Sequence, residues 1–321
     1  MKAVDTILFD VSKNELFKIT ENYKMLHRKL KTTWKVLINR EELSSHVLED
    51  VKILIIAAPQ NAFTDDELSS LKSMVERGDS VLVAMYDGGE ERTNTNINFF
   101  LEEFGIVVNN DCVVRAKYHK FYHPKECHIS NGILNRAITK YLMKILLITN
   151  HNGFSEEPAT PNFVYPYGAT LTVKKPAAAV LSSSDVCYPV KRPVAAMYTS
   201  EKSGGKLFVI GSGHFFADQY LESECNDLIR EMVFNYLVLG LYDALGVKHE
   251  PLRLIAPQFE TPFPPLQLAV FPPTFREPPP PPLELFDLDE AFSSERSQLA
   301  RLTNKCLQPP SARLAQGELI L

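Results

Sequence analysis

Proline distribution limits what the C-terminal part of this 321-residue chain can fold into. Eight of the 22 prolines lie before residue 250, twelve lie between Pro251 and Pro282, and the last two follow residue 300. Proline lacks a backbone donor and has a fixed φ, so this stretch can neither pair inside a sheet nor wind into a helix. We therefore predict three parts: a folded domain at 1–240, a proline-rich arm at 241–290 and a short helical or disordered tail at 291–321.

A βαβ unit is the clearest local pattern in the first part. Residues 51–58 form a continuous β-branched apolar run, which is typical of a strand covered on both faces. Thr64 and Glu67 follow in the spacing of a capping box, and Gly78 provides a C-terminal helix cap. Another apolar run at 80–85 completes the unit, which implies parallel strands joined by a right-handed crossover.

The same alternation of strand and helix patterns extends to residue 240 and predicts the α/β fold class. We expect a mostly parallel, doubly wound sheet. Further strands are expected at 7–9, 36–38, 163–165, 171–173, 178–181, 194–198 and 206–211, and further helices at 23–35, 96–104 and 226–239, with a short helix possible at 293–304.

Composition excludes several classes of protein. A net charge of −5 and a pI near 5.9 argue against a nucleic-acid surface, which needs clustered lysine and arginine. The five cysteines form no CxxC pair, as expected for reduced thiols. Asp5 and Asp10 interrupt the first apolar run, and no run reaches the length of a membrane helix. We expect a soluble intracellular protein without membrane insertion.

The arm differs from an ordinary solvated linker. Residues 278–282 are five consecutive prolines, which favour a polyproline II helix. Phenylalanines and leucines interrupt the prolines, although disordered spacers are usually poor in aromatic residues. Because an extended arm has no core of its own, we expect these apolar side chains to contact a partner surface.

Two strand ends are candidates for a ligand site, because ligands of parallel sheets lie beyond the carboxyl ends of the strands. The first is the stretch that contains Asp87, Gly88, Gly89 and Glu90, where carboxylates and close backbone suit a metal or a polyol. The alternative is a glycine-rich turn before a helix with a solvated acidic rim.

The second strand end contains Ser212 and His214. It lacks the third glycine of a dinucleotide fingerprint, the GK[ST] of a phosphate loop and the G-x-S-x-G of a hydrolase elbow. The alternative is a tight turn between strand and helix. We expect neither a metal at the irregularly spaced His119, His123 and His128 nor a nucleophile at Cys112 or Cys127, and we predict no cofactor.

Several long, irregular motifs resemble the GIFT-domain family of intraflagellar transport complex B core subunits. The resemblance covers nearly the whole chain to about Cys306. The stretches that carry it lie at 93–100, 108–111, 122–126, 130–132, 165–169, 214–220, 248–251, 258–262 and 280–289. The resemblance implies a domain that is shared with bacterial gliding-machinery proteins and is similar in fold to class I glutamine amidotransferases.

The family resemblance also implies a function and partners. It implies a non-enzymatic scaffold of the complex B core, needed for cilium assembly and cargo transport, and a location at the cilium, the basal body or centrosome and the cytoplasm. Its partners would be core subunits, above all tetratricopeptide-repeat subunits, with kinesin and dynein motors contacted indirectly. The implied partner-binding residues are Phe271, Pro272, Pro273, Phe275, Pro279, Pro280, Pro281, Pro282, Leu283, Leu285 and Phe286.

Two rival functions remain open from the residues alone. One is a small-ligand module, for example for a sugar, at the strand ends. The other is a degenerate hydrolase of the amidotransferase type, which would need a nucleophile at a strand-to-helix turn. The chain also departs from the family pattern between residues 237 and 248, where a longer acidic linker is expected.

Overall fold

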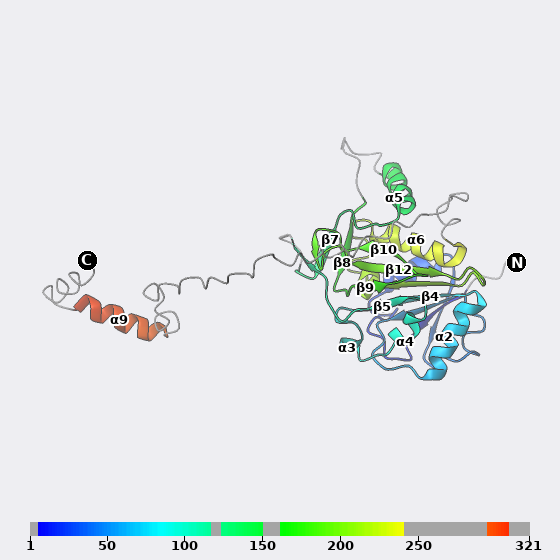
Figure 1. Cartoon of the computed structure of the whole chain (residues 1–321), viewed down its shortest axis with the longest axis horizontal. Coiled ribbons are helices and arrows are strands. Elements are labelled where there is room, and N and C mark those ends of the chain that lie inside the picture. The colour runs from blue at the N-terminus through cyan, green and yellow to red at the C-terminus, as the bar shows by residue number, and fades with distance from the viewer. Residues whose placement is uncertain (1–5, 117–122, 150–160, 241–293, 308–321) are drawn as a thin grey trace, which may run out of the picture. The chain divides into compact units, whose positions relative to one another are not determined.

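A computed structural model describes residues 6–116, 123–149, 161–240 and 294–307 (Figure 1). The chain divides into two units, Met1–Thr261 and Pro262–Leu321. The α/β domain lies in the first unit, and α9 (Glu295–Leu307), a helix at the predicted place, is the described part of the second. The predicted arm at 241–290 and all of its expected partner-binding residues lie outside the described residues, so the three-part division stays a prediction.

A seven-stranded sheet forms the centre of the domain, in the order β10-β12-β13-β4-β3-β1-β2. The five strands from β13 to β2 are parallel to one another. At the other edge β12 is antiparallel to β13, and β10 is antiparallel to β12. The prediction of a mostly parallel sheet is therefore confirmed. The strands are β1 (Thr6–Asp10), β2 (Lys35–Asn39), β3 (Ile53–Ala57), β4 (Ser80–Ala84), β10 (Ala178–Ser182), β12 (Pro193–Thr199) and β13 (Lys206–Ile210).

Helices cover both faces of this sheet, as Figure 1 shows. All five side chains of β3 are buried, because Ile53 and Ile55 pack into one apolar cluster and Leu54 and Ile56 into another. The first cluster contains residues of α1 (Lys24–Lys31), η1 (Gly213–Phe216) and α6 (Asn226–Leu239), and the second contains residues of α2 (Asp65–Arg77) and α4 (Asn98–Glu102). Burial on two faces explains the continuous apolar runs in the sequence.

The βαβ unit forms as predicted. Thr64 Oγ1 accepts the amide of Glu67 at 3.3 Å, and Glu67 Oε2 accepts the amide of Thr64 at 2.8 Å, which completes the capping box. Gly78 ends α2 with a φ of 111°, a left-handed conformation that glycine adopts without strain. Strands β3 and β4 then pair in parallel with Ile53 opposite Ser80.

Three small antiparallel pairs lie outside the main sheet: β5 (Ile106–Val108) with β9 (Leu171–Val173), β6 (Val114–Arg115) with β11 (Cys187–Tyr188), and β7 (Glu126–Ile129) with β8 (Phe163–Pro166). The turn after β8 contacts the carboxyl ends of β4 and β13. There the Asp87 amide donates to the Tyr167 carbonyl at 3.1 Å, and the Ala169 amide donates to the Gly211 carbonyl at 3.0 Å. The segment after β8 is thus bonded to the residues that follow β4 and β13.

Helix α5 (Arg136–Thr149) was not predicted from the sequence. The sequence feature that could have indicated this helix is Asn135. Its side chain accepts hydrogen bonds from the amides of Ala137 at 2.9 Å and Ile138 at 3.2 Å, as an N-terminal helix cap does. Ile138 and Leu142, four residues apart, are buried on one face. No helix within the described ranges is long and apolar enough to cross a bilayer.

Candidate functional site

The two candidate strand ends lie side by side in the structure. β4 and β13 are parallel neighbours with Ala84 opposite Ile210, so both chains leave the sheet at the same edge. The Met85 amide donates to the Ile210 carbonyl at 2.9 Å, and the Gly213 amide donates back to the Met85 carbonyl. Backbone hydrogen bonds therefore hold the segment that starts at Met85 against the segment that leads to His214.

A buried carboxylate with two cations forms the charged part of this edge. Asp87 is 1% exposed, and its Oδ1 lies 2.5 Å from Nη1 of Arg92. Lys125, from the turn before β7, pairs with the other oxygen of Asp87, and this hydrogen bond raises the pKa of the Lys125 ammonium. Because one negative charge meets two positive charges, the group carries a net positive charge. Arg92 is half-exposed and stacks over the ring of Tyr86 at 4.5 Å.

The glycines beside Asp87 allow close approach of the backbone. Gly88 and Gly89 have φ values of 83° and 56° and lead into the short helix α3 (Gly89–Thr93). A Cβ atom on Gly89 would lie 2.6 Å from the carbonyl oxygen of Asn109. Glu90 does not join the charged group, because its carboxylate accepts the amide of Asn98 at the start of α4. Close packing against Asn109 and the positive φ values therefore explain the two glycines of this turn without a ligand.

Four aromatic rings surround the imidazole of His214. The ring centroids of Phe17, Tyr167, Tyr86 and Tyr220 lie 4.8, 5.1, 5.5 and 6.1 Å from it. Burial among these rings lowers the pKa of His214, which favours the neutral imidazole near pH 7. The site thus combines a neutral histidine and aromatic faces with the charged group of Asp87, Arg92 and Lys125, beside the carboxylate of Glu126.

The geometry does not activate a nucleophile at this edge. The hydroxyl of Ser212 is buried and donates to the carbonyl of Pro166, so its proton is not shared with His214. Burial raises the pKa of the Cys112 thiol to about 11 and also raises that of Cys225. A hydrogen bond with Cys187 together with burial raises the pKa of Cys127. These thiols are therefore protonated near pH 7 and are poor nucleophiles.

The histidines and Asp218 near these strand ends have structural contacts. His128 Nε2 lies 3.2 Å from Glu224 Oε1, and the ring of His123 stacks on Tyr167 at 5.4 Å. Asp218 accepts the amides of Lys24 and Met25, so it caps α1. The described part of the chain contains no group of three metal-ligating side chains, and His119 lies outside it.

Sequence reasoning missed several members of this site. Lys125 neutralises Asp87, Tyr220 donates its hydroxyl to Glu126, and Tyr167 contributes a ring. Lys125 and Glu126 lie just before and at the start of β7, Tyr167 lies in the turn after β8, and Tyr220 lies in the segment after η1. These three segments are far apart in the sequence. The family resemblance was the available signal, because the described residues of the matching stretches at 122–126, 165–169 and 214–220 meet at this edge.

Comparison with known proteins identifies the family. The profile of the IFT52 GIFT domain matches residues 6–244, and that of the IFT52 central domain matches residues 218–281. The chain belongs to the IFT52 family. It is 42% identical over 369 aligned residues to the intraflagellar transport protein 52 homolog of Homo sapiens, covering 94% of this chain and 84% of the human protein.

The mouse proteins show the same relationship. The homolog of Mus musculus is also 42% identical, and the match covers 94% of this chain and 86% of the mouse protein. The solved structure of the mmIFT52 N-terminal domain superposes with a TM-score of 0.66 at 44% identity, covering 74% of this chain and 98% of that domain. This likeness supports the α/β fold described above. The 369 aligned positions exceed the 321 residues of this chain, so these IFT52 relatives carry insertions relative to it.

Proposed function

We propose that this chain is a non-enzymatic scaffold subunit of intraflagellar transport, within the complex B core that carries cargo for cilium assembly. The observation that carries the proposal is the family match, which includes both the α/β domain and most of the proline-rich segment up to residue 281. The two curated relatives named above are called intraflagellar transport proteins. The corresponding location would be the cilium, its basal body or centrosome, and the cytoplasm.

The chemistry of the strand ends supports a role without catalysis. The hydroxyl of Ser212 is bonded to a backbone carbonyl, and the pKa of the Cys112 thiol is raised to about 11. A hydrolase or amidotransferase needs a nucleophile that an adjacent base or a lowered pKa activates. The contacts of these two residues give neither form of activation, so the alternative of a degenerate amidotransferase-type hydrolase gains no support.

The arm is the proposed contact with tetratricopeptide-repeat subunits, through which kinesin and dynein motors would be reached indirectly. A polyproline II helix is ordered before it binds and exposes its carbonyl groups, so it loses little conformational entropy on docking. The phenylalanines at 271, 275 and 286 would supply the apolar anchors. Because interface energy concentrates in a few aromatic residues, these three should dominate the affinity.

A reconstitution with purified tetratricopeptide subunits tests this role. The chain without residues 270–290 should no longer co-purify with them, and a triple variant with Phe271→Ala, Phe275→Ala and Phe286→Ala should bind at least about tenfold more weakly. The matched control carries Glu277→Gln, Asp287→Asn and Asp289→Asn in the same stretch and should bind as the wild type does. Undiminished capture by the deleted chain would show that the arm is not the contact.

A small-ligand site at the strand ends is the second candidate function. It is favoured by the rings of Tyr86, Tyr167 and Tyr220 around His214, beside the half-exposed Arg92, since sugars bind to aromatic faces and polar groups together. A ligand that binds the folded state must raise the melting temperature. A panel of saccharides and nucleotides that leaves the melting temperature unchanged would remove this candidate.

A further inference from the structure

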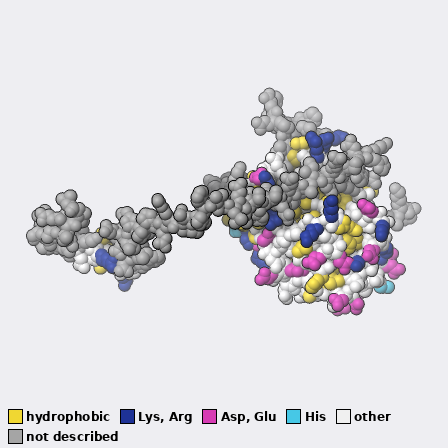
Figure 2. All heavy atoms as spheres, in the orientation of Figure 1, with side chains coloured by type: hydrophobic (Ala, Val, Ile, Leu, Met, Phe, Trp, Pro, Cys, Tyr) yellow, Lys and Arg dark blue, Asp and Glu magenta, His cyan; other side chains and the backbone are white. Residues whose placement is uncertain are grey.

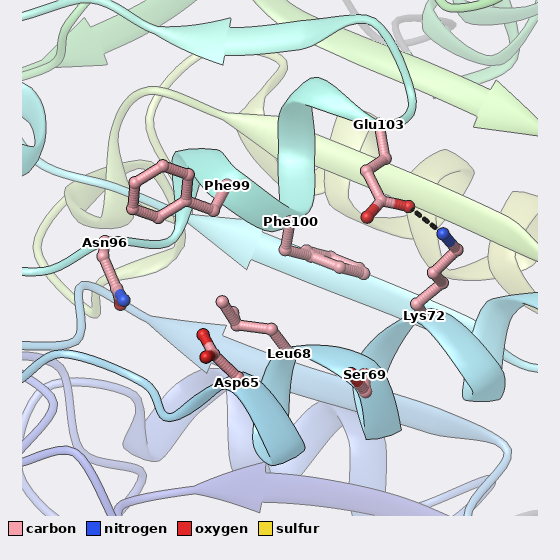
Figure 3. A pocket seen from close by; sticks show the side chains of 8 residues that line it. All are labelled: Asp65, Leu68, Ser69, Lys72, Asn96, Phe99, Phe100 and Glu103. Carbon is pink, nitrogen blue, oxygen red and sulfur yellow. Dashed lines mark ion pairs between the residues drawn. The ribbon is translucent and has the colours of Figure 1, made fainter.

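A groove lies between α2 and α4 on the outer side of the domain. It has a volume of about 440 Å³ and is lined by side chains from both helices and from Asn96, which precedes α4. Leu68 of α2 and Phe100 of α4 form its apolar part, as Figure 3 shows. All the residues that line the groove lie in the α/β domain.

An aromatic side chain remains in solvent at this groove. Phe99 is 68% exposed, although the adjacent Phe100 is 2% exposed and belongs to the core beneath α2 and α4. Among the described residues, Phe99 is the most exposed of the large hydrophobic side chains. A large, exposed aromatic side chain beside apolar groove residues is the kind of anchor that dominates the affinity of protein interfaces.

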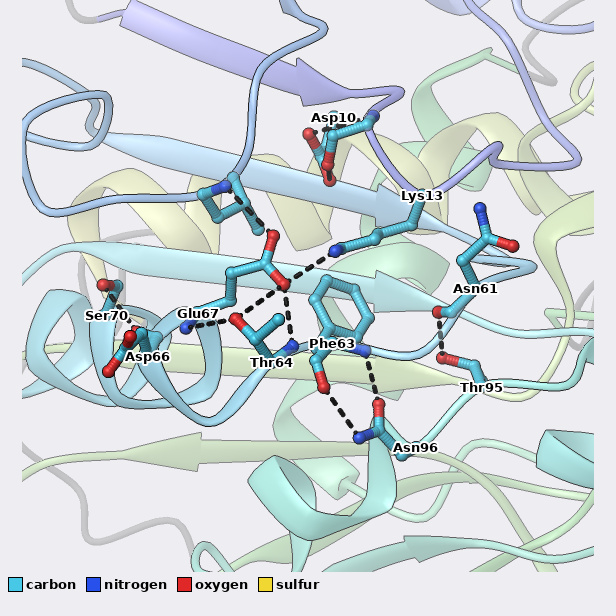
Figure 4. A network of polar contacts seen from close by, with 12 residues as sticks. Asp10, Lys13, Asn61, Phe63, Thr64, Asp66, Glu67, Ser70, Thr95 and Asn96 are labelled. Carbon is cyan, nitrogen blue, oxygen red and sulfur yellow. Dashed lines mark hydrogen bonds and ion pairs between the residues drawn. The ribbon is translucent and has the colours of Figure 1, made fainter.

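Two asparagine side chains that precede Phe99 fix the backbone from which it projects. Asn96 accepts the Phe63 amide at 2.7 Å and donates to the Phe63 carbonyl at 2.9 Å (Figure 4). Asn98 donates to the Val108 carbonyl at 3.0 Å and accepts the Val108 amide at 2.9 Å. Because the backbone that leads into Phe99 is already ordered, binding of a partner over Phe99 would cost less conformational entropy than binding to a loose loop.

The charges of the groove determine the kind of partner that fits it. Asp65 lies at one end and the ion pair between Lys72 and Glu103, with an N–O distance of 2.5 Å, lies at the other (Figure 3). Within the described ranges Asp65 has no ion pair, so its carboxylate is available to a cation. Asp and Glu side chains also border apolar atoms on the face that carries these helices, as Figure 2 shows.

We propose that this groove binds a short linear segment of a partner protein that carries an apolar anchor and a nearby lysine or arginine. The anchor, a phenylalanine, tryptophan or leucine, packs on Phe99 and Leu68, and the cation pairs with Asp65. The charge complementarity favours a basic segment over a neutral or acidic one, since an acidic segment would meet Asp65 with a like charge. The groove gives the domain a second, separate interaction surface besides the arm.

A peptide selection on the full chain tests the proposal. A displayed random library of peptides about twelve residues long is selected on immobilised protein, and the enriched peptides are synthesised and titrated by fluorescence anisotropy. We expect enrichment of sequences that combine a large apolar residue with lysine or arginine and that bind with a Kd below about 100 μM. Failure to enrich any peptide, or enrichment of acidic peptides, would overturn the proposal.

Matched variants separate the groove from other surfaces. Phe99→Ser and Asp65→Lys should each weaken the enriched peptide at least about tenfold, whereas Tyr188→Ser, at another exposed aromatic residue, and Asp66→Lys, in the same helical turn, should not. Replacing the lysine of the peptide by glutamate should restore binding to the Asp65→Lys chain. Equal affinity for all four variants would contradict the assigned site, and melting curves verify that each variant is folded.

Discussion

Replacing Glu15 by glutamine should remove a large pH dependence of the stability of the domain. Glu15 lies in the loop after β1 and is 1% exposed, close to the buried carboxylate of Asp10. Burial, followed by the negative charge of Asp10, raises the pKa of Glu15 from 4.5 to about 8, although the backbone amides of Glu15 and Lys13 offset part of this effect. The folded protein therefore keeps a neutral carboxylic acid at pH 7.

The direction of the pH effect follows from proton binding. Between pH 4.5 and about 8 the folded state retains a proton that the unfolded chain releases, so the free energy of unfolding falls as the pH rises. The stabilisation is complete below pH 4.5 and is lost as the pH passes through 8. Each pH unit in this window removes at most about 1.4 kcal/mol, which gives an upper limit of about 5 kcal/mol over the whole window.

Urea denaturation of the wild type and of Glu15→Gln at several pH values between 5 and 9 measures this effect. The difference between the two free energies of unfolding should change by about 2–3 kcal/mol from pH 5 to pH 7.5, in favour of the variant at high pH. Glu21→Gln, at a solvent-exposed position, serves as the control and should follow the wild type. Parallel pH curves for wild type and Glu15→Gln would refute the reasoning.

Two further predictions concern the local structures that hold the domain together. Thr64→Ala removes the side-chain cap of α2 and should lower the free energy of unfolding, measured by urea denaturation, by about 1 kcal/mol. Ser73→Ala, in the exposed middle of the same helix, is the control and should leave the free energy of unfolding unchanged. An equal loss in both variants would contradict the role of Thr64 as a cap. Gly89→Ala and Gly204→Ala both place a side chain at positive φ, which costs roughly 1–2 kcal/mol, but only at Gly89 would the added Cβ collide with backbone. The same denaturation assay should therefore show a clearly larger loss at Gly89, and equal losses would contradict the close approach seen there.

Features that depend on neighbouring residues were predictable from the sequence. Spacings of a few residues define the capping box of Thr64 and Glu67 and the cap at Gly78. The parallel pair of β3 and β4 follows, because this short helix joins the two strands directly. Helix α6 begins and ends at the expected residues, because the apolar pattern that predicts it lies within a single segment of 14 residues. Helix α5 was missed although Asn135 caps it in the same local manner.

Only the tertiary structure decided what surrounds the strand ends and what remains exposed. Phe17, Lys125, Tyr167 and Tyr220 meet Asp87 and His214 through chain segments up to about 200 residues apart, and no local spacing encodes such contacts. The exposure of Phe99 is similar, because the sequence shows two adjacent phenylalanines and only packing against α2 buries one of them. Hydrogen bonds between neighbouring residues repeat at fixed intervals and leave a pattern in the sequence. Contacts between distant segments depend on how the whole chain closes around its core, so a single sequence carries no periodic signal for them.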